Sequence, residues 1–326
     1  MCPSYPIPSP AGAWNQFSCD LWKEVNKMML NPIIEKDIKT KMRGWRTPAL
    51  LSVYLLFLTG VLYLFFLVND MVFGRYGTAS FTPRVAVNAY NVIAWFQFGL
   101  LMLIVPALTS TAISGERERQ TLDLLLCSDI SPWSIVVGKV VVSIAHIMFL
   151  VVASLPVLGM VFMFGGISFG EILLLFLFYV LTALMAASLG VCLSTVFKRN
   201  VTAIITTYIC LGILAVGPLI ALFIWALFYE SRSSAPLTYS MISAILFPSP
   251  FFGFTSFMTG GRASDLGILF TDLQNLAAAD TGFIRHFKPW MINGFFDIVF
   301  SGIMIWLSAI KLVPVKRVKQ KRRKKA

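Results

Sequence analysis

Six long apolar segments dominate this sequence and limit what it can fold into. Each is long enough to cross the hydrocarbon core of a bilayer as a helix, which takes about 20 residues. The chain is 57% hydrophobic and 13% charged, against about a quarter charged in soluble domains. These properties exclude a soluble enzyme, a disordered chain and a disulfide-stapled secreted domain. The expected spans cover residues 48–68, 85–113, 132–164, 172–197, 201–229 and 290–313.

The predicted fold class is therefore an all-α integral membrane protein with a transmembrane domain over residues 47–313. Pro156 and Pro218 lie inside spans and are expected to kink them, which a helix bundle tolerates. Residues 1–27 are Pro-rich and then polar, which indicates a flexible extension. A long outer loop, residues 230–288, precedes the last span.

The distribution of basic residues predicts the orientation. With the N-terminus inside, cytoplasmic segments hold 21 of the 27 Lys and Arg residues, so both termini are expected in the cytoplasm. Much of the net charge of +12 lies in the tail, residues 314–326. A nucleic-acid-binding arm is the alternative. Because the tail follows a span directly, we favour a contact with anionic lipid and expect no nucleic-acid partner.

The segment before the first span has the pattern of an amphipathic helix over residues 28–46. Asn31 can cap it and Pro32 suits its first turn. Apolar residues then recur at spacings of four, four and three, at Ile34, Ile38, Met42 and Trp45, with charged residues between them. We expect this helix to lie in the inner membrane interface. A positive flank that merely orients the first span is the simpler alternative.

The loop between the second and third spans, residues 113–133, is rich in alternating charges. We expect a charged turn and a short helix with Leu122, Leu125 and Leu126 on one face. Adjacent acidic and basic residues at 116–119 suit a contact with another protein. A solvated loop whose leucines touch the interface is an equal alternative.

Residues 240–261 are almost wholly apolar but are broken at Pro248-Ser249-Pro250. This pattern favours a re-entrant pair of short outer helices over a seventh crossing, which would place the basic tail outside. An extracellular cap with its own small core is the competing interpretation.

No catalytic or metal-binding motif is visible, so we expect no enzymatic activity and no metal in this chain. Asp297 is a candidate functional carboxylate within the last span. The alternative places it at the outer headgroup level. Further polar residues within spans are Asn88, Asn91, Gln97 and Thr206, which either line a pathway or join helices.

The stretch PALTSTAISGERERQTLDLLLCSDISPWSIVVGK resembles the permease subunits of type-2 ABC exporters. The positions that carry the resemblance are Pro106, Glu116, Glu118, Thr121-Leu122, Leu124-Leu125, Ser131-Pro132 and Gly138-Lys139. The opening NPIIEKDIKTKMR is similar to the group described as involved in multicopper enzyme maturation. The resemblance covers residues 31–313.

This resemblance implies a permease that pairs with a second permease subunit, as a homodimer or a heterodimer, and with two separate ABC-type ATPase subunits. ATP and Mg would then bind the ATPases, with no cofactor in this chain. It also implies a cytoplasmic coupling helix that contacts the ATPase through Glu116, Arg117, Glu118, Arg119, Thr121, Leu122, Leu125 and Leu126. The interfacial helix would contact it as well.

The expected location is the plasma membrane of a bacterium. An ion-coupled secondary transporter that uses Asp297 is the alternative function. Inverted internal repeats would support that alternative, and none is visible in the sequence.

Overall fold

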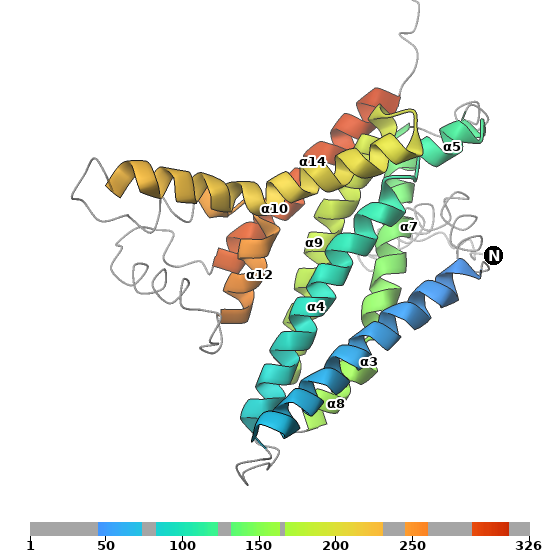
Figure 1. Cartoon of the computed structure of the whole chain (residues 1–326). Coiled ribbons are helices and arrows are strands. Elements are labelled where there is room, and N and C mark those ends of the chain that lie inside the picture. The colour runs from blue at the N-terminus through green and yellow to red at the C-terminus, as the bar shows by residue number, and fades with distance from the viewer. Residues whose placement is uncertain are drawn as a thin grey trace, which may run out of the picture. The chain divides into compact units, whose positions relative to one another are not determined.

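The computed structural model describes residues 45–73, 83–122, 132–163, 167–230, 245–259 and 289–312. Over these ranges the chain is helical and contains no strands. The chain divides into two compact units, Met1–Pro48 and Ala49–Ala326, and all packing reported below lies within the second. The helices are α3 (Arg46–Phe73), α4 (Pro83–Thr109), α5 (Ser114–Glu118), α7 (Pro132–Ala153), α8 (Leu155–Met163), α9 (Phe169–Val196), α10 (Asn200–Glu230), α12 (Pro250–Thr259) and α14 (Pro289–Leu312) (Figure 1).

Within the described ranges, six helical stretches are long and apolar enough to cross a membrane. They cover Thr47–Asn69, Val85–Glu118, Trp133–Phe162, Phe169–Val196, Asn200–Trp225 and Trp290–Leu312. Each coincides with one of the predicted spans to within about five residues. The prediction of six helices long and apolar enough to cross a membrane is therefore confirmed. The second stretch runs further than expected because α5 follows α4 after only a short turn.

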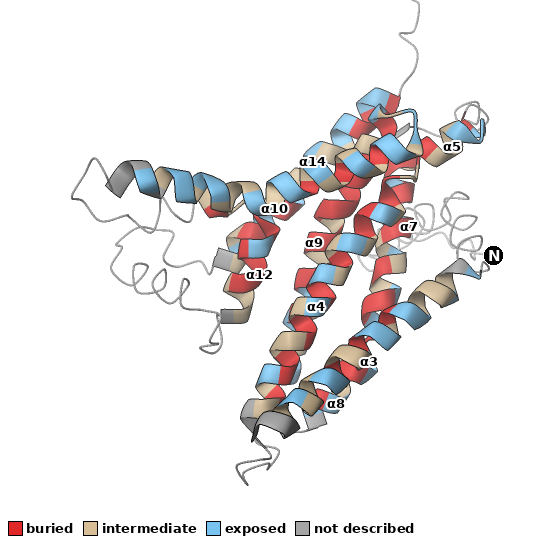
Figure 2. Cartoon of the chain, in the orientation of Figure 1, coloured by how far each residue is buried: buried red, intermediate tan, exposed pale blue. Residues whose placement is uncertain are grey.

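Helix α9 forms the centre of the fold and packs against α4, α7, α10 and α14 (Figure 2). A capping box begins it, in which the Ser168 hydroxyl accepts from the Glu171 backbone N–H and the Glu171 carboxylate accepts from the Ser168 N–H. Small side chains on the buried part let neighbouring helices come close. At Gly190, an added Cβ would overlap the Thr109 hydroxyl of α4. This glycine is therefore required for the approach of α4 to α9.

The third span is interrupted at Ser154, where α7 ends and α8 begins. The Ser154 hydroxyl donates to the Val151 carbonyl and accepts from the Gln97 amide of α4, 2.8 Å away. Pro156 lies two residues after this break. The irregularity expected at Pro156 is therefore a break in the helix at Ser154. Pro218 behaves differently, because it lies inside α10, which continues through it.

The described part of the outer apolar segment packs onto the bundle through its phenylalanines. The chain turns at Phe247 and Pro248, and α12 begins at Pro250. Phe254 is fully buried and stacks on Phe98 of α4, with ring centroids 4.3 Å apart. Its ring also meets those of Trp95, Phe178 and Tyr179. The first arm of the predicted hairpin lies largely outside the described residues, and membrane entry stays a prediction.

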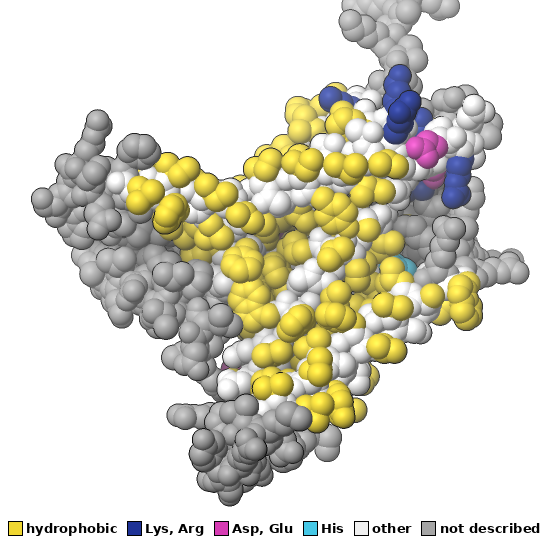
Figure 3. All heavy atoms as spheres, in the orientation of Figure 1, with side chains coloured by type: hydrophobic (Ala, Val, Ile, Leu, Met, Phe, Trp, Pro, Cys, Tyr) yellow, Lys and Arg dark blue, Asp and Glu magenta, His cyan; other side chains and the backbone are white. Residues whose placement is uncertain are grey.

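The surface of the second unit is strongly apolar except at one end. Apolar side chains cover most of the face shown in Figure 3, and charged side chains gather near α5. Helix α10 is the least covered span, and its exposed side chains include Val201, Ile205, Ile209, Ile213, Val216 and Ile220. Lipid would cover such a face in a membrane.

Candidate functional site

The start of helix α5 is bound to α9 by a buried hydroxyl. The backbone N–H groups of Ile113 and Ser114 both donate to the Ser194 Oγ of α9, at 2.9 and 2.8 Å. All three residues are buried. The first N–H groups of a helix have no partner within the helix and need one elsewhere. Ser194 supplies that partner and fixes where α5 begins.

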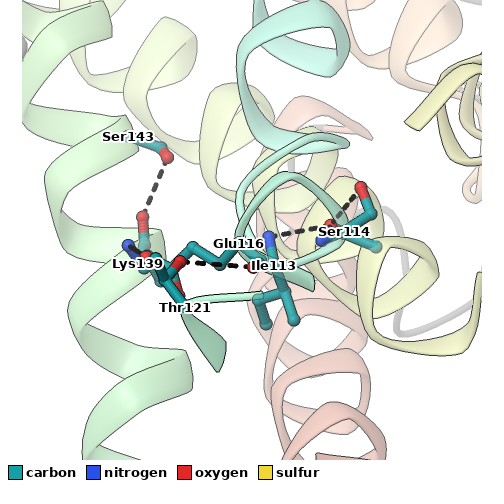
Figure 4. Close-up of polar contacts among 7 residues, drawn as sticks. Ile113, Ser114, Glu116, Thr121, Lys139 and Ser143 are labelled. Carbon is teal, nitrogen blue, oxygen red and sulfur yellow. Dashed lines mark hydrogen bonds and ion pairs between the residues drawn. The ribbon is translucent and has the colours of Figure 1, made fainter. Parts of the chain in front are cut away.

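The three charged residues that follow each bind a different helix. Glu116 forms an ion pair with Lys139 of α7, with Oε1 and Nζ 2.5 Å apart, and both side chains are largely buried (Figure 4). Arg117 donates to the carbonyls of Thr195 and Phe197 at the end of α9, both at 3.3 Å. A cation at this position complements the negative end of the helix dipole.

Glu118 binds the start of α10. Its carboxylate accepts from the Asn200 backbone N–H at 2.7 Å and from the Asn200 side-chain amide at 2.5 Å. An anion at a helix N-terminus satisfies free N–H groups and complements the positive end of the dipole. Helix α5 thus joins the ends of α7, α9 and α10 that lie beside it.

The residues directly after α5 are exposed on the surface of the protein. Arg119, Gln120 and Thr121 are exposed, and Gln120 has a left-handed backbone with φ of 58°. The Thr121 hydroxyl donates to the Glu116 carbonyl, which closes the turn. The charged residues expected to form a turn therefore form helix α5, which ends at Glu118. Leu122 is helical again, and the expected leucine helix stays a prediction. Leu122 is buried, whereas Leu125 and Leu126 lie outside the described residues.

The predicted interfacial helix is almost wholly outside the described residues, which exclude Ile34, Ile38 and Met42. Trp45, just before α3, is 85% exposed. That exposure leaves an apolar side chain available to lipid or to a partner, and the interfacial helix stays a prediction.

The polar residues that sequence reasoning grouped as a possible pathway differ in burial, and the pathway stays a prediction. Gln97 and Asp297 are fully buried, Asn91 and Thr206 are half-buried, and Asn88 is exposed. No hydrogen bond joins any two of these five described residues. Gln97 instead joins α4 to the break at Ser154.

Asp297 lies within α14, which packs on α9, α12 and α7. Its side chain is fully buried among protein groups. The residues that sequence reasoning missed are Ser194 and Asn200, single polar residues with no local pattern to mark them.

The model of the family described as ABC-2 family transporter protein matches residues 31–251 of this chain. This chain belongs to the ABC-2 transporter family. The match covers the described helices from α3 to α10 and the start of α12, and so includes α5 with its partners. Among curated proteins, none matches the chain significantly.

Membership in the family makes the chain the membrane-spanning permease part of an ABC transporter, a transport component that is not itself catalytic. It implies pairing with ABC ATPase subunits. With six apolar helices long enough to span, the chain is a multi-pass membrane protein. The resemblance to type-2 ABC permeases is thus confirmed, and the narrower resemblance to the multicopper maturation group stays a hypothesis.

Proposed function

We propose that this permease belongs to an ATP-driven exporter and that helix α5 transmits the movement of a separate ATPase to the transmembrane helices. The observation that carries the proposal is the set of contacts made by Glu116, Arg117 and Glu118. A force applied to α5 would reach α7, α9 and α10 together, because each charged side chain binds one of them. A coupling element needs this combination of a rigid short helix and several attachments.

The same contacts divide the residues of this region into two roles. Glu116, Arg117 and Glu118 bind within the chain, which leaves Arg119, Gln120 and Thr121 as the exposed residues available to a partner. We propose that Arg119, Gln120 and Thr121 contact the ATPase, together with Leu125 and Leu126. Glu116, Arg117 and Glu118 would then act by positioning the helix.

The remaining features of the proposal follow from the charge distribution and the family. Two permease subunits, identical or homologous, would assemble with two ATPases that bind ATP and Mg. Both termini would lie in the cytoplasm of a bacterial cell, with α5 on the same side. Family membership favours this function over an ion-coupled secondary transporter.

Purification of the full chain from its native membranes tests the proposal directly. An ABC-type ATPase should be recovered with it, and Arg119→Glu should reduce that recovery about tenfold or more, because an unpaired interface charge costs about 2–5 kcal/mol. Lys311→Glu is the matched control, since Lys311 is an exposed cation in the last turn of α14. Equal recovery of the ATPase with both variants would contradict the assignment of α5.

A second variant separates docking from coupling. Glu118→Ala should retain the ATPase, because this side chain binds Asn200, but should weaken the link between α5 and α10 to the single hydrogen bond from the Ser114 hydroxyl to Asn200 Oδ1. A fluorescent probe attached at Val201, an exposed residue in the first turn of α10, should respond less to ATP in the variant than in the wild-type complex. An unchanged ATP response in Glu118→Ala would show that α10 moves without this contact.

A further inference from the structure

Two neighbouring side chains of α14 hold three buried oxygen atoms that lack a hydrogen-bond partner; Ser308 Oγ, about three turns further along, is a fourth. The three are Oδ1 of Asn293 and both carboxyl oxygens of Asp297, one helical turn further along. Both residues are 0% exposed. Buried polar atoms are nearly always hydrogen-bonded, so three unpaired acceptors on neighbouring side chains require an explanation.

The outer helix α12 is docked tightly at this point. The Asn293 amide donates to the carbonyls of Phe247 and Ser249, at 2.8 and 3.2 Å, just before α12 begins. On α12 itself, a Cβ at Gly253 would overlap the Asn293 side chain. The Asn293 amide thus joins α14 to the outer segment, and its remaining oxygen lies against Gly253 of α12.

One hydroxyl of α14 and two hydroxyls of α9, the helix packed most extensively against it, have already used their single proton. Ser301 donates to the carbonyl of Asp297 itself, at 2.6 Å. On α9, Thr182 donates to the Phe178 and Tyr179 carbonyls, and Ser188 donates to the Met185 carbonyl. Since each hydroxyl has one hydrogen to give, none is left for the Asp297 carboxyl.

Among the described residues, no cation forms an ion pair with the Asp297 carboxyl. Helix α12 carries no titratable residue. Lys139 of α7 pairs with Glu116, and Lys311 lies in the last turn of α14. The other titratable groups on the packed helices are His146 of α7 and Glu171, Tyr179 and Cys192 of α9, and no hydrogen bond or ion pair joins any of them to Asp297.

An ionised carboxylate in this position would be both desolvated and unpaired, which costs several kcal/mol even after relaxation. A neutral carboxyl group removes that cost. It also gains an O–H donor, and the unpaired Asn293 oxygen lies one turn away on the same helix face, where side chains four residues apart are neighbours. A single proton on the Asp297 carboxyl would therefore remove the buried charge and give the Asn293 oxygen a hydrogen-bond donor.

We propose that Asp297 and Asn293 form an intramembrane proton-binding site that is closed by α12. The Asp297 carboxyl holds a proton while α12 is docked on α14. When α12 moves away and water enters, the carboxyl O–H bond breaks and the proton passes to water, leaving an ionised carboxylate. This site goes beyond the proposed coupling role of α5 and does not depend on it.

Infrared difference spectroscopy of the full chain in lipid nanodiscs tests the proposal without an ATPase. The spectrum should contain the C=O band of a protonated carboxyl at neutral pH, and Asp297→Asn should remove it. Glu171→Gln is the matched control and should remove an ionised carboxylate band, since Glu171 is solvent-accessible and caps α9. Loss of an ionised carboxylate band in Asp297→Asn would overturn the proposal.

Labelling with a hydrophobic carbodiimide provides a measurement that needs no variant at Asp297. This reagent attacks protonated carboxyl groups in apolar surroundings, so mass spectrometry should find the adduct on Asp297 and not on Glu171. Asn293→Ala should release α12 from α14 and expose the Asp297 carboxyl to water. In spectra recorded between about pH 5 and about pH 9, where an exposed carboxyl is ionised, the protonated-carboxyl band should then be weaker than in the wild type. Absence of any adduct on Asp297, or an unchanged band in Asn293→Ala, would refute the closed site.

Discussion

Replacement of Ser194 by Ala should weaken the attachment of helix α5 to α9, leaving the Arg117 contacts in place. The Ser194 hydroxyl accepts two backbone N–H groups, those of Ile113 and Ser114, and all three residues are buried. Each buried donor left without a partner costs about 1–3 kcal/mol. Because the freed chain can relax and partly regain water, we expect Ser194→Ala to lower the free energy of unfolding by about 2–4 kcal/mol.

Ser188→Ala is the matched control for this experiment. Ser188 lies on the same helix and is equally buried, but its hydroxyl only donates to the Met185 carbonyl, 2.8 Å away. Its loss leaves no N–H group unpaired and should cost less than about 1 kcal/mol. Denaturant titration in detergent measures the difference, and hydrogen exchange should show the Ile113 and Ser114 amides losing protection. Equal stability of the two variants, with both amides still protected, would refute the reasoning.

Two further predictions concern the outer helix α12 and the orientation of the chain in the membrane. Gly253→Ala should destabilise the fold by about 1–3 kcal/mol, since the new Cβ overlaps Asn293; Gly302→Ala meets no atom within 4 Å and should be neutral or stabilising in the same unfolding assay. In a cysteine-free background, a cysteine at Ser168 should react with an impermeant thiol reagent in intact cells, and one at Thr121 only after permeabilisation. Labelling of both positions in intact cells would overturn the predicted orientation.

The spans were predictable because the signal for them is local. A membrane-crossing helix needs a sustained run of apolar residues, and that property can be read from the sequence without knowing what the helix packs against. The predicted segment 290–313 and the observed Trp290–Leu312 differ by one residue at the C-terminal end. The break at Ser154 was located only approximately, from Pro156, because the interruption also depends on a hydrogen bond from α4.

The contacts of α5 were not predictable in the same way. Ser194 lies 80 residues from Ser114 along the chain, and no spacing rule connects them. The charges at 116–119 pointed to a protein contact, but sequence reasoning had no means to tell a partner subunit from the chain's own helices. Asp297 shows the same limit: sequence reasoning left open a position within the last span or at the outer headgroup level, and its burial depends on the helices packed against α14.

Glu116, Arg117 and Glu118 are consecutive in the chain, and this limits the changes of length that α5 can accept during evolution. Loops between helices usually tolerate inserted or deleted residues well. Here a single inserted residue before Glu116 would rotate the three side chains by about 100° around the α5 axis and move each away from its partner at once. A substitution affects one attachment, but a change of length removes all three. Length variants should therefore be far rarer in this short helix than in the outer segments of the same protein.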